Sequence, residues 1–306
     1  MTKTAFLFAG QGAQYLGMGR DLYDHYPIVK ETIDQASQVL GYELRDLIDN
    51  EETKLNQTRY TQPAILATSV AIYRLLKEKG YQPDMVAGLS LGEYAALVAS
   101  GALDFEEAVA LVAKRGTYME EAAPAGSGKM VAVLNTPVEV IEEACKTASE
   151  VGIVTPANYN TPSQIVIGGE VAAVDCAVEL LQEAGAKRLI PLNVSGPFHT
   201  ALLESASQQL ARTLEEVAFS DFTCPLVGNT EATIMEKERI VELLTRQVKE
   251  PVRFYESIAV MQDAGVTNFI EIGPGKVLSG FVKKIDKSAK LANVEDLASL
   301  DALLGN

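Results

Sequence analysis

The first hundred residues alternate short apolar runs with longer segments in which apolar residues recur every three or four positions. The apolar runs at residues 2–9 and 84–90 predict buried strands. Between them, residues 63–79 have helical spacing, with Pro63 suited to a first helical turn and Gly80 to the position after the last turn. We therefore expect a strand, a helix that begins at Pro63, and a second strand in this order.

Helical spacing returns twice after the second strand. Residues 91–100 predict a helix that ends at Gly101, and a further helix follows toward Ala122. Asp104 and Glu107 precede this helix with the spacing of a capping box, in which two side chains bond to the first turn. The alternation of strands and helices favours a mainly parallel sheet with helices on its faces.

The middle of the chain carries a different pattern. Runs with strand and helix character follow in the order β-α-β-β-α-β, at residues 128–134, 137–148, 152–159, 164–169, 171–185 and 187–194. This is the order of a ferredoxin-like unit, and Gly, Ser and Pro flank it. We therefore expect an α/β fold in which residues 1–127 and 196–306 form an α/β-hydrolase-like core with a parallel sheet. Residues 128–195 would form an inserted ferredoxin-like small domain.

The composition is that of a folded, acidic globular protein. The chain has 306 residues, 47% of them apolar, and a formal net charge of −15. That charge opposes binding to nucleic acid or to anionic membranes. No apolar run reaches the roughly 20 residues that cross a bilayer, and the N-terminus lacks the layout of a secretory signal. We expect a monomeric, cytoplasmic protein that binds neither membrane nor nucleic acid.

The glycine-rich turns and the cysteines do not match a cofactor or metal site. Gly10 and Gly12 begin like a dinucleotide fingerprint, but Tyr15 takes the third glycine position. Residues 273–276 lack the spacing and the Ser or Thr of a phosphate loop. The three cysteines are far apart and form no CxxC motif. We expect neither a cofactor nor a metal.

Ser90 is the strongest candidate for chemistry. It lies in Gly88-Leu89-Ser90-Leu91-Gly92, a G-x-S-x-G pattern between a predicted strand and a predicted helix. That context makes the pattern a nucleophile elbow, a tight turn that projects the serine hydroxyl at a helix N-terminus. The free N–H groups of that terminus, beginning with Leu91, can stabilise an oxyanion.

A serine nucleophile needs a base, and the chain has two histidines. His25 lies among polar residues on an early helix, which predicts a surface position, whereas His199 lies where the small domain returns to the core. Loops at such junctions commonly line clefts, so we favour His199. No acid is marked as its partner: Asp221 and Asp263 are available, and a carbonyl group could orient the ring instead.

Arg115 adds a substrate clue. On the predicted helix after Asp104 it falls on or beside the apolar stripe, which also includes Leu111 and Met119. Such an arginine either extends to solvent, pairs with a nearby glutamate, or binds an anion. If it points toward Ser90, its fork geometry suits a substrate carboxylate.

With these residues in view, the chain resembles the malonyl-CoA:acyl carrier protein transacylases, and more broadly the acyltransferase domains of fatty acid and polyketide synthases. The resemblance covers nearly the whole chain. Its motifs appear in the family's order: FLFAGQGAQ, TQPA, GLSLGEY, LVAKRG, ANYNTPSQIVIGG, GPFH, QVKEPVRF and EIGPGKVLSG.

The resemblance implies a function and a set of roles. Malonyl would pass from malonyl-CoA to Ser90 and then to the phosphopantetheine thiol of acyl carrier protein, supplying extender units for fatty acid synthesis, with CoA as product. His199 would be the base, the backbone N–H groups of Gln11 and Leu91 the oxyanion hole, and Arg115 the clamp on the malonyl carboxylate. Family members orient the histidine through a main-chain carbonyl near the position that matches Gln247.

Other matching positions imply contacts to the substrate. The small-domain residues Asn158, Asn160, Gln164 and Arg188 would contact the CoA or pantetheine arm. Phe198 is similar to the family's malonyl-selective pattern, in which a bulky ring leaves little room for an α-methyl group. The chain departs from the family at Leu89, where a histidine usually precedes the nucleophile, and this removes a polar neighbour but not the proposed base.

Two other functions compete with acyl transfer. A serine esterase of the α/β-hydrolase type keeps its histidine late in the chain, whereas more than 100 residues follow His199. A carrier-binding scaffold without activity needs neither Ser90 nor His199. An acidic carrier would require a local basic patch on this acidic protein, and the cluster of Lys276, Lys283, Lys284 and Lys287 is our expectation for part of it.

Overall fold

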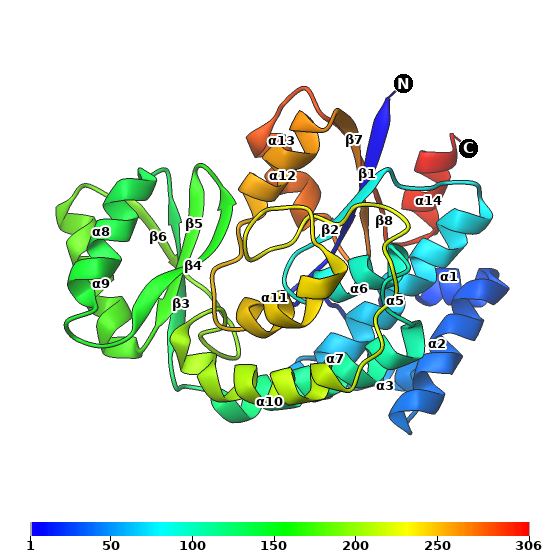
Figure 1. Ribbon diagram of the computed structural model, residues 1–306, viewed down its shortest axis with the longest axis horizontal. Helices are drawn as coiled ribbons and strands as arrows, with labels where there is room; N and C mark the ends of the chain where they lie inside the picture. The colour runs from blue at the N-terminus through cyan, green and yellow to red at the C-terminus, as the bar shows by residue number, and fades with distance from the viewer. Residues whose placement is uncertain (1, 306) are drawn as a thin grey trace.

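The computed structural model describes residues 2–305 as a mixed α/β structure with a parallel sheet and a separate antiparallel sheet (Figure 1). The two sheets lie side by side, with the antiparallel sheet at the left of the view and most helices around the parallel sheet at the right. No helix within the described residues is both long and apolar enough to cross a membrane.

The parallel sheet has the order β2-β1-β7-β8. Its strands are β1 (Lys3–Phe8), β2 (Met85–Gly88), β7 (Val266–Ile272) and β8 (Lys290–Val294). In the central strand β1, Phe6 and Phe8 pack into one apolar cluster and Ala5 and Leu7 into another on the opposite face. Burial on both faces explains why β1 is a continuous apolar run rather than an alternating one.

Helices cover both faces of this sheet. The first core cluster contains side chains of α2 (Pro27–Leu40), α5 (Thr58–Glu78), α6 (Gly92–Ala99) and α7 (Phe105–Ala122), and the second those of α12 (Phe254–Asp263) and α13 (Val277–Ile285). The remaining helices are α1 (Arg20–His25), α3 (Leu44–Asn50), α4 (Glu52–Leu55), α10 (Glu204–Glu215), α11 (Ile240–Gln247) and α14 (Leu297–Leu304).

The antiparallel sheet has the order β4-β5-β3-β6 and lies entirely within residues 129–191. Its elements follow the predicted sequence: β3 (Lys129–Leu134), α8 (Val138–Ala148), β4 (Val154–Thr161), β5 (Gln164–Gly169), α9 (Val171–Glu183) and β6 (Arg188–Pro191). One face packs with α8 and α9 into a core of its own. The other face carries a small apolar cluster that includes Met130 and Val166.

Helix boundaries agree with the sequence pattern at three places and differ at one. Gly80 and Gly101 follow their helices with positive φ, and the Asp104 side chain accepts from the Glu107 N–H as the N-cap of α7. The predicted start at Pro63 is wrong, because α5 begins at Thr58. The preceding turn is held by buried contacts instead, since the hydroxyl of Thr61 donates to the carbonyls of Leu55 and Gln57.

The turn between β2 and α6 is packed against β1 with no spare room. A Cβ built on Gly92 would lie 2.1 Å from the carbonyl oxygen of Phe8, and one on Gly88 would lie 2.0 Å from the carbonyl carbon of Gly92. Real Cβ atoms do not approach backbone this closely, so only glycine fits at both positions. The close approach fixes where the residues between them lie.

Substitution Gly92→Ala is expected to lower the free energy of unfolding by about 3 kcal/mol, because the new Cβ meets backbone atoms that cannot move aside. Gly280→Ala is the matched control, since Gly280 lies inside α13 with no atom within 4 Å of the built Cβ. It should leave stability unchanged or raise it by up to about 1 kcal/mol through helix propensity. Urea denaturation measures both, and equal effects would contradict the packing argument.

Candidate active site

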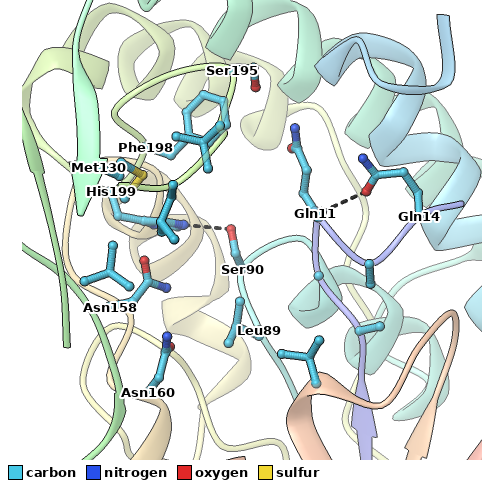
Figure 2. Close-up of a pocket in the computed structure, with 18 of the residues that line it drawn as sticks. Gln11, Gln14, Leu89, Ser90, Met130, Asn158, Asn160, Ser195, Phe198 and His199 are labelled. Atoms are coloured by element: carbon cyan, nitrogen blue, oxygen red, sulfur yellow. Dashed lines mark hydrogen bonds between the residues drawn. The ribbon is translucent and has the colours of Figure 1, made fainter. Parts of the chain in front are cut away.

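A pocket of about 820 Å³ lies where the two sheets meet. Its wall combines the loop after β1, the turn after β2 and the loop at residues 192–199 with β3, β4 and β5 of the antiparallel sheet. Ser90 lies in the middle of the close-up, with His199 on one side and Gln11 on the other (Figure 2). Segments that are far apart in the sequence therefore meet around one hydroxyl group.

Ser90 occupies the tight turn that the sequence predicted. It lies two residues after the end of β2 and two before the first residue of α6, has φ of 55°, and is 9% exposed. Positive φ is uncommon for a residue with a Cβ and indicates a backbone held by its surroundings. Its backbone N–H donates to Oδ1 of Asn229 at 2.7 Å, so this N–H is already engaged.

His199 is the partner of Ser90. The two atoms Ser90 Oγ and His199 Nε2 are 2.8 Å apart, and Nδ1 of the ring lies 2.7 Å from the backbone carbonyl of Gln247. A carbonyl can only accept, so Nδ1 carries the proton and Nε2 is free to accept from the serine hydroxyl. No carboxylate within residues 2–305 bonds to the ring. Of the two acids considered, Asp221 pairs with Lys237 on the surface.

Burial keeps this imidazole neutral. His199 is 4% exposed, and desolvation, with a smaller contribution from the charge of Arg115, lowers the pKa of its side chain to about 4. At neutral pH the ring is therefore an acceptor, as a base must be. His25 is exposed, as predicted, and its ring bonds to the carbonyl of Asp21.

Arg115 is buried beside the same hydroxyl. Only 1% of it is exposed, Nη1 donates to Oε1 of Gln62 at 2.8 Å, and Nη2 donates to Oε1 of Gln247 at 2.9 Å. Nη2 also lies 3.3 Å from Ser90 Oγ. Within residues 2–305, Nε has no hydrogen-bond partner, and the side chains that bond to the guanidinium are the uncharged Gln62, Ser90 and Gln247. Two of the alternatives that the sequence left open for the Arg115 side chain, extension to solvent and pairing with a glutamate, are therefore excluded.

The predicted oxyanion donors lie on either side of the serine. Leu91 begins the turn into α6, and Gln11 lies across the pocket from His199 (Figure 2). Among residues 2–305, neither backbone N–H bonds to a protein acceptor, whereas that of Ser90 does. Unpaired N–H groups at a helix N-terminus can receive a developing negative charge.

The remaining predicted residues divide into two groups. Asn158, Asn160, Gln164 and Phe198 line the pocket, and Oδ1 of the buried Asn160 has no partner among the described residues. Arg188 is exposed on β6 and does not line the pocket, so its predicted contact to a CoA arm stays a prediction. Leu89, which replaces the expected histidine, also lines the pocket and adds an apolar side chain beside Ser90.

Three residues that support the site were missed by the sequence reasoning. Gln62 holds Arg115, Asn229 holds the backbone of Ser90, and Glu93 accepts from the amide of Gln247. A signal existed for Glu93, because it is the one acidic residue in an otherwise apolar helix, GEYAALVA. Nothing in the local sequence distinguishes Asn229 from an ordinary loop residue.

The family model "Acyl transferase domain" matches residues 5–302. The chain belongs to this acyltransferase family. Among curated proteins, the acyltransferase is 47% identical to the malonyl CoA-acyl carrier protein transacylase of Bacillus subtilis, over 98% of this chain and 96% of that protein. It is 46% identical to the protein of the same name from Haemophilus influenzae, over 99% and 98% of the two chains.

Solved structures agree with this assignment. The acyltransferase superposes with a TM-score of 0.98 on MCAT from Streptococcus pneumoniae, which is 85% identical over 99% of both chains. A malonyl-transacylase solved in complex with a type II PKS acyl-carrier protein is 44% identical, with a TM-score of 0.96 over the whole of both chains. The family resemblance drawn from the motifs is thereby confirmed.

The buried neutral histidine makes a prediction about stability. The folded-state pKa of His199 is depressed to about 4, against about 6.5 in the unfolded chain, so protons bind the unfolded chain first as the pH falls. The contribution of neutral His199 to the free energy of unfolding is therefore complete above about pH 6.5 and is lost as the pH falls toward about 4. Relative to His199→Asn, the acyltransferase should lose about 2 kcal/mol of unfolding free energy between about pH 7.5 and about pH 5.

Chemical denaturation of both proteins at the two pH values measures this difference. Asparagine suits the comparison because it tolerates the positive φ of position 199 and cannot titrate. Taking the difference between the proteins removes every shared group whose pKa is the same in both. A difference that stays constant with pH would mean that the imidazole is protonated as easily in the folded protein as in the unfolded one.

Proposed function

We propose that this acyltransferase moves malonyl from malonyl-CoA to the phosphopantetheine thiol of an acyl carrier protein through a malonyl-serine intermediate. The observation that carries the proposal is the convergence on one hydroxyl: His199 Nε2 lies 2.8 Å and Arg115 Nη2 3.3 Å from Ser90 Oγ. A base makes the serine a nucleophile, and a buried cation beside it selects an acyl group with a second carboxylate. The names of the relatives support the same substrates.

In the first half-reaction Ser90 Oγ attacks the thioester carbonyl carbon, and His199 Nε2 takes the hydroxyl proton. The carbonyl oxygen becomes an oxyanion that the N–H groups of Gln11 and Leu91 can hold. When this intermediate collapses, the carbon–sulfur bond breaks and His199 gives the proton to the departing CoA sulfur. Malonyl remains on Ser90 as an ester.

The second half-reaction runs the same groups in reverse. The thiol of the carrier's phosphopantetheine arm gives its proton to His199 and attacks the ester carbonyl. The carbon–oxygen bond to Ser90 breaks, and the proton returns to Oγ. The two half-reactions share one base and one oxyanion site, which gives ping-pong kinetics.

Arg115 has the capacity for the second carboxylate. Its guanidinium has five N–H donors, of which two bond to the amide oxygens of Gln62 and Gln247. The donors that remain can receive a carboxylate without breaking these two bonds. Phe198, which lines the pocket, would limit the space for a substituent on the α-carbon.

The arrangement of elements supports the finer fold proposals. We assign residues 1–127 and 196–306 to an α/β-hydrolase-like core and 128–195 to a ferredoxin-like small domain. The order β4-β5-β3-β6 with two helices on one face is the order that a βαββαβ unit of this kind requires. The pantetheine arm would cross the pocket between them along Asn158, Asn160 and Gln164.

The wider biological role follows from this reaction. The product would be an extender unit for fatty acid synthesis, and the reaction as written needs no cofactor. An acidic carrier needs local positive charge on this acidic protein. We therefore propose that part of its docking face is formed by the exposed lysines around α13, namely Lys276, Lys283, Lys284 and Lys287. A monomeric state and a cytoplasmic location stay predictions.

Covalent trapping tests the proposal. Incubation with malonyl-CoA should add one malonyl group to the intact protein, with peptide mapping placing it on Ser90. Ser90→Ala should abolish the adduct, and Ser220→Ala, an exposed serine, should not. Rapid loss of the adduct to water would favour an esterase, persistence until a thiol arrives favours the transferase, and the absence of an adduct would favour a scaffold.

Arg115→Ala should separate malonyl from acetyl transfer. Loss of the carboxylate's buried partner should cost about 3 kcal/mol of transition-state stabilisation for malonyl-CoA, which lowers its kcat/KM roughly a hundredfold. The kcat/KM for acetyl-CoA should fall much less. Arg212→Ala, on the exposed face of α10, is the control and should change neither. Equal losses for both acyl groups would mean that Arg115 only supports the fold.

A further inference from the structure

Beneath Ser90 lies a buried carboxylate that the reaction described above does not use. Glu93 is in the first turn of α6, three residues after the serine, and only 1% of it is exposed. Burying an ionisable carboxyl costs free energy unless its oxygens are hydrogen-bonded. Its contacts should therefore show what this carboxylate does for the site.

Each carboxylate oxygen holds one group of the site. Oε1 accepts from the backbone N–H of Asn229 at 3.1 Å, and Oε2 accepts from Nε2 of Gln247 at 2.5 Å. Asn229 in turn accepts the backbone N–H of Ser90 and donates to the carbonyl of Gly88. Glu93 thus connects the serine turn to the loop of Asn229 and to the end of α11.

The carboxylate also decides which way the amide of Gln247 faces. A carboxylate can only accept, so it requires the NH₂ group of Gln247, and the guanidinium of Arg115 can only donate, so it requires Oε1. The observed contacts satisfy both demands. A reversed amide would place NH₂ against Arg115 and Oε1 against the carboxylate of Glu93, two repulsive contacts.

We propose that Glu93 is a positioning residue for acyl transfer: its two oxygens fix Asn229 and the Gln247 amide, and through them the serine turn, Arg115 and the carbonyl that orients His199. The inference rests on the proposed function and adds a residue to it. Gln247 is the common element, because its side chain holds Arg115 at 2.9 Å while its backbone carbonyl holds His199 at 2.7 Å.

The role requires the ionised form of Glu93. A protonated carboxyl would present an O–H to one of two N–H donors and would lose that bond. Burial raises the pKa of Glu93 to about 7, despite the opposing hydrogen bonds and the charge of Arg115. The other groups that face it do not titrate near pH 7. A guanidinium such as that of Arg115 keeps its proton in proteins, Asn229 and Gln247 are uncharged, and burial raises the pKa of Tyr94 to about 12.

The substitution Glu93→Gln tests the role with little change of shape. The glutamine amide has one oxygen that can accept a hydrogen bond and one NH₂ group that can only donate. Its NH₂ group would therefore face either the backbone N–H of Asn229 or the NH₂ of Gln247, and that hydrogen bond would be lost. We expect kcat/KM for malonyl-serine formation at about pH 8 to fall roughly 10- to 100-fold, as small misplacements of reacting groups do. The preference for malonyl over acetyl should fall as well, because Arg115 loses its fixed partner.

The pH profile distinguishes positioning from support of the fold. In the wild type, kcat/KM should fall as the pH drops through about 7, the pKa of Glu93 in the free protein. In Glu93→Gln this inflection should be absent, leaving only the one near 4 that belongs to His199. The two profiles should therefore converge at about pH 5.5.

Two further variants complete the design. Glu93→Asp keeps a carboxylate, so it should regain part of the rate and the inflection near neutrality, and it carries the test alone if Glu93→Gln does not fold. Asp296→Asn removes a carboxylate that accepts a backbone N–H at the start of α14, far along the chain, and should match the wild type.

The outcomes separate this inference from the proposed function. If the wild type forms no malonyl-serine, the proposed function fails. If it does, but Glu93→Gln keeps the wild-type inflection or Glu93→Asp loses it, the positioning role alone is overturned. Equal losses for malonyl and acetyl with an unchanged pH profile would also overturn it, since they indicate a structural role.

Discussion

The close approach of two backbone segments at the serine turn is the constraint on which the site depends. Gly92 lies against the carbonyl of Phe8 and Gly88 lies against Gly92, so the strand–turn–helix connection has only one way to pack on β1. Ser90 is consequently held with positive φ at the sheet edge. In the proposed reaction, a hydroxyl that is fixed in this way loses little conformational freedom, which is one source of catalytic rate.

The site is assembled from elements that are distant in sequence, and both a shared apolar core and polar contacts join them. Ser90 from the turn, His199 from the loop after the antiparallel sheet and Gln247 at the end of α11 are joined by hydrogen bonds of 2.7–2.9 Å. Buried polar networks are costly when incomplete and specific when satisfied. The bonds around Ser90 therefore fix the position of the small sheet's return loop as well as the chemistry.

The local parts of this arrangement could be predicted from sequence, and the non-local parts could not. The strand, turn and helix around Ser90 are encoded by a short apolar run, two glycines and a helical repeat, all within residues 85–101. The place of Arg115 on or beside an apolar stripe left three environments open for its side chain, and the structure selects the buried one. Its partners did not, because the amides of Gln62 and Gln247 approach from other helices, and no local pattern specifies such a meeting.

The same distinction explains the remaining differences. The start of α5 at Thr58 rather than Pro63 depends on bonds from Thr61 to the preceding short helix, which is a tertiary effect that outweighs the proline signal. Strand β8 was not singled out, because it is a partly buried edge strand without a strong apolar pattern. The role of Gln247 was inferred only from the family resemblance, since the contact that matters is made by its backbone carbonyl.

The electrostatics of the pocket are consistent with a histidine that bonds to a carbonyl and to no carboxylate among residues 2–305. A carboxylate on Nδ1 would stabilise the imidazolium and raise the pKa of His199, whereas a carbonyl orients the ring with a weaker effect on its charge. Burial, together with the positive charge of Arg115 nearby, lowers the pKa of His199 and keeps the ring neutral. Within residues 2–305, the carboxylate of this network belongs to Glu93 and contacts Gln247, so negative charge supports the guanidinium's partner. In the proposed reaction this leaves the guanidinium itself free for the substrate's anion.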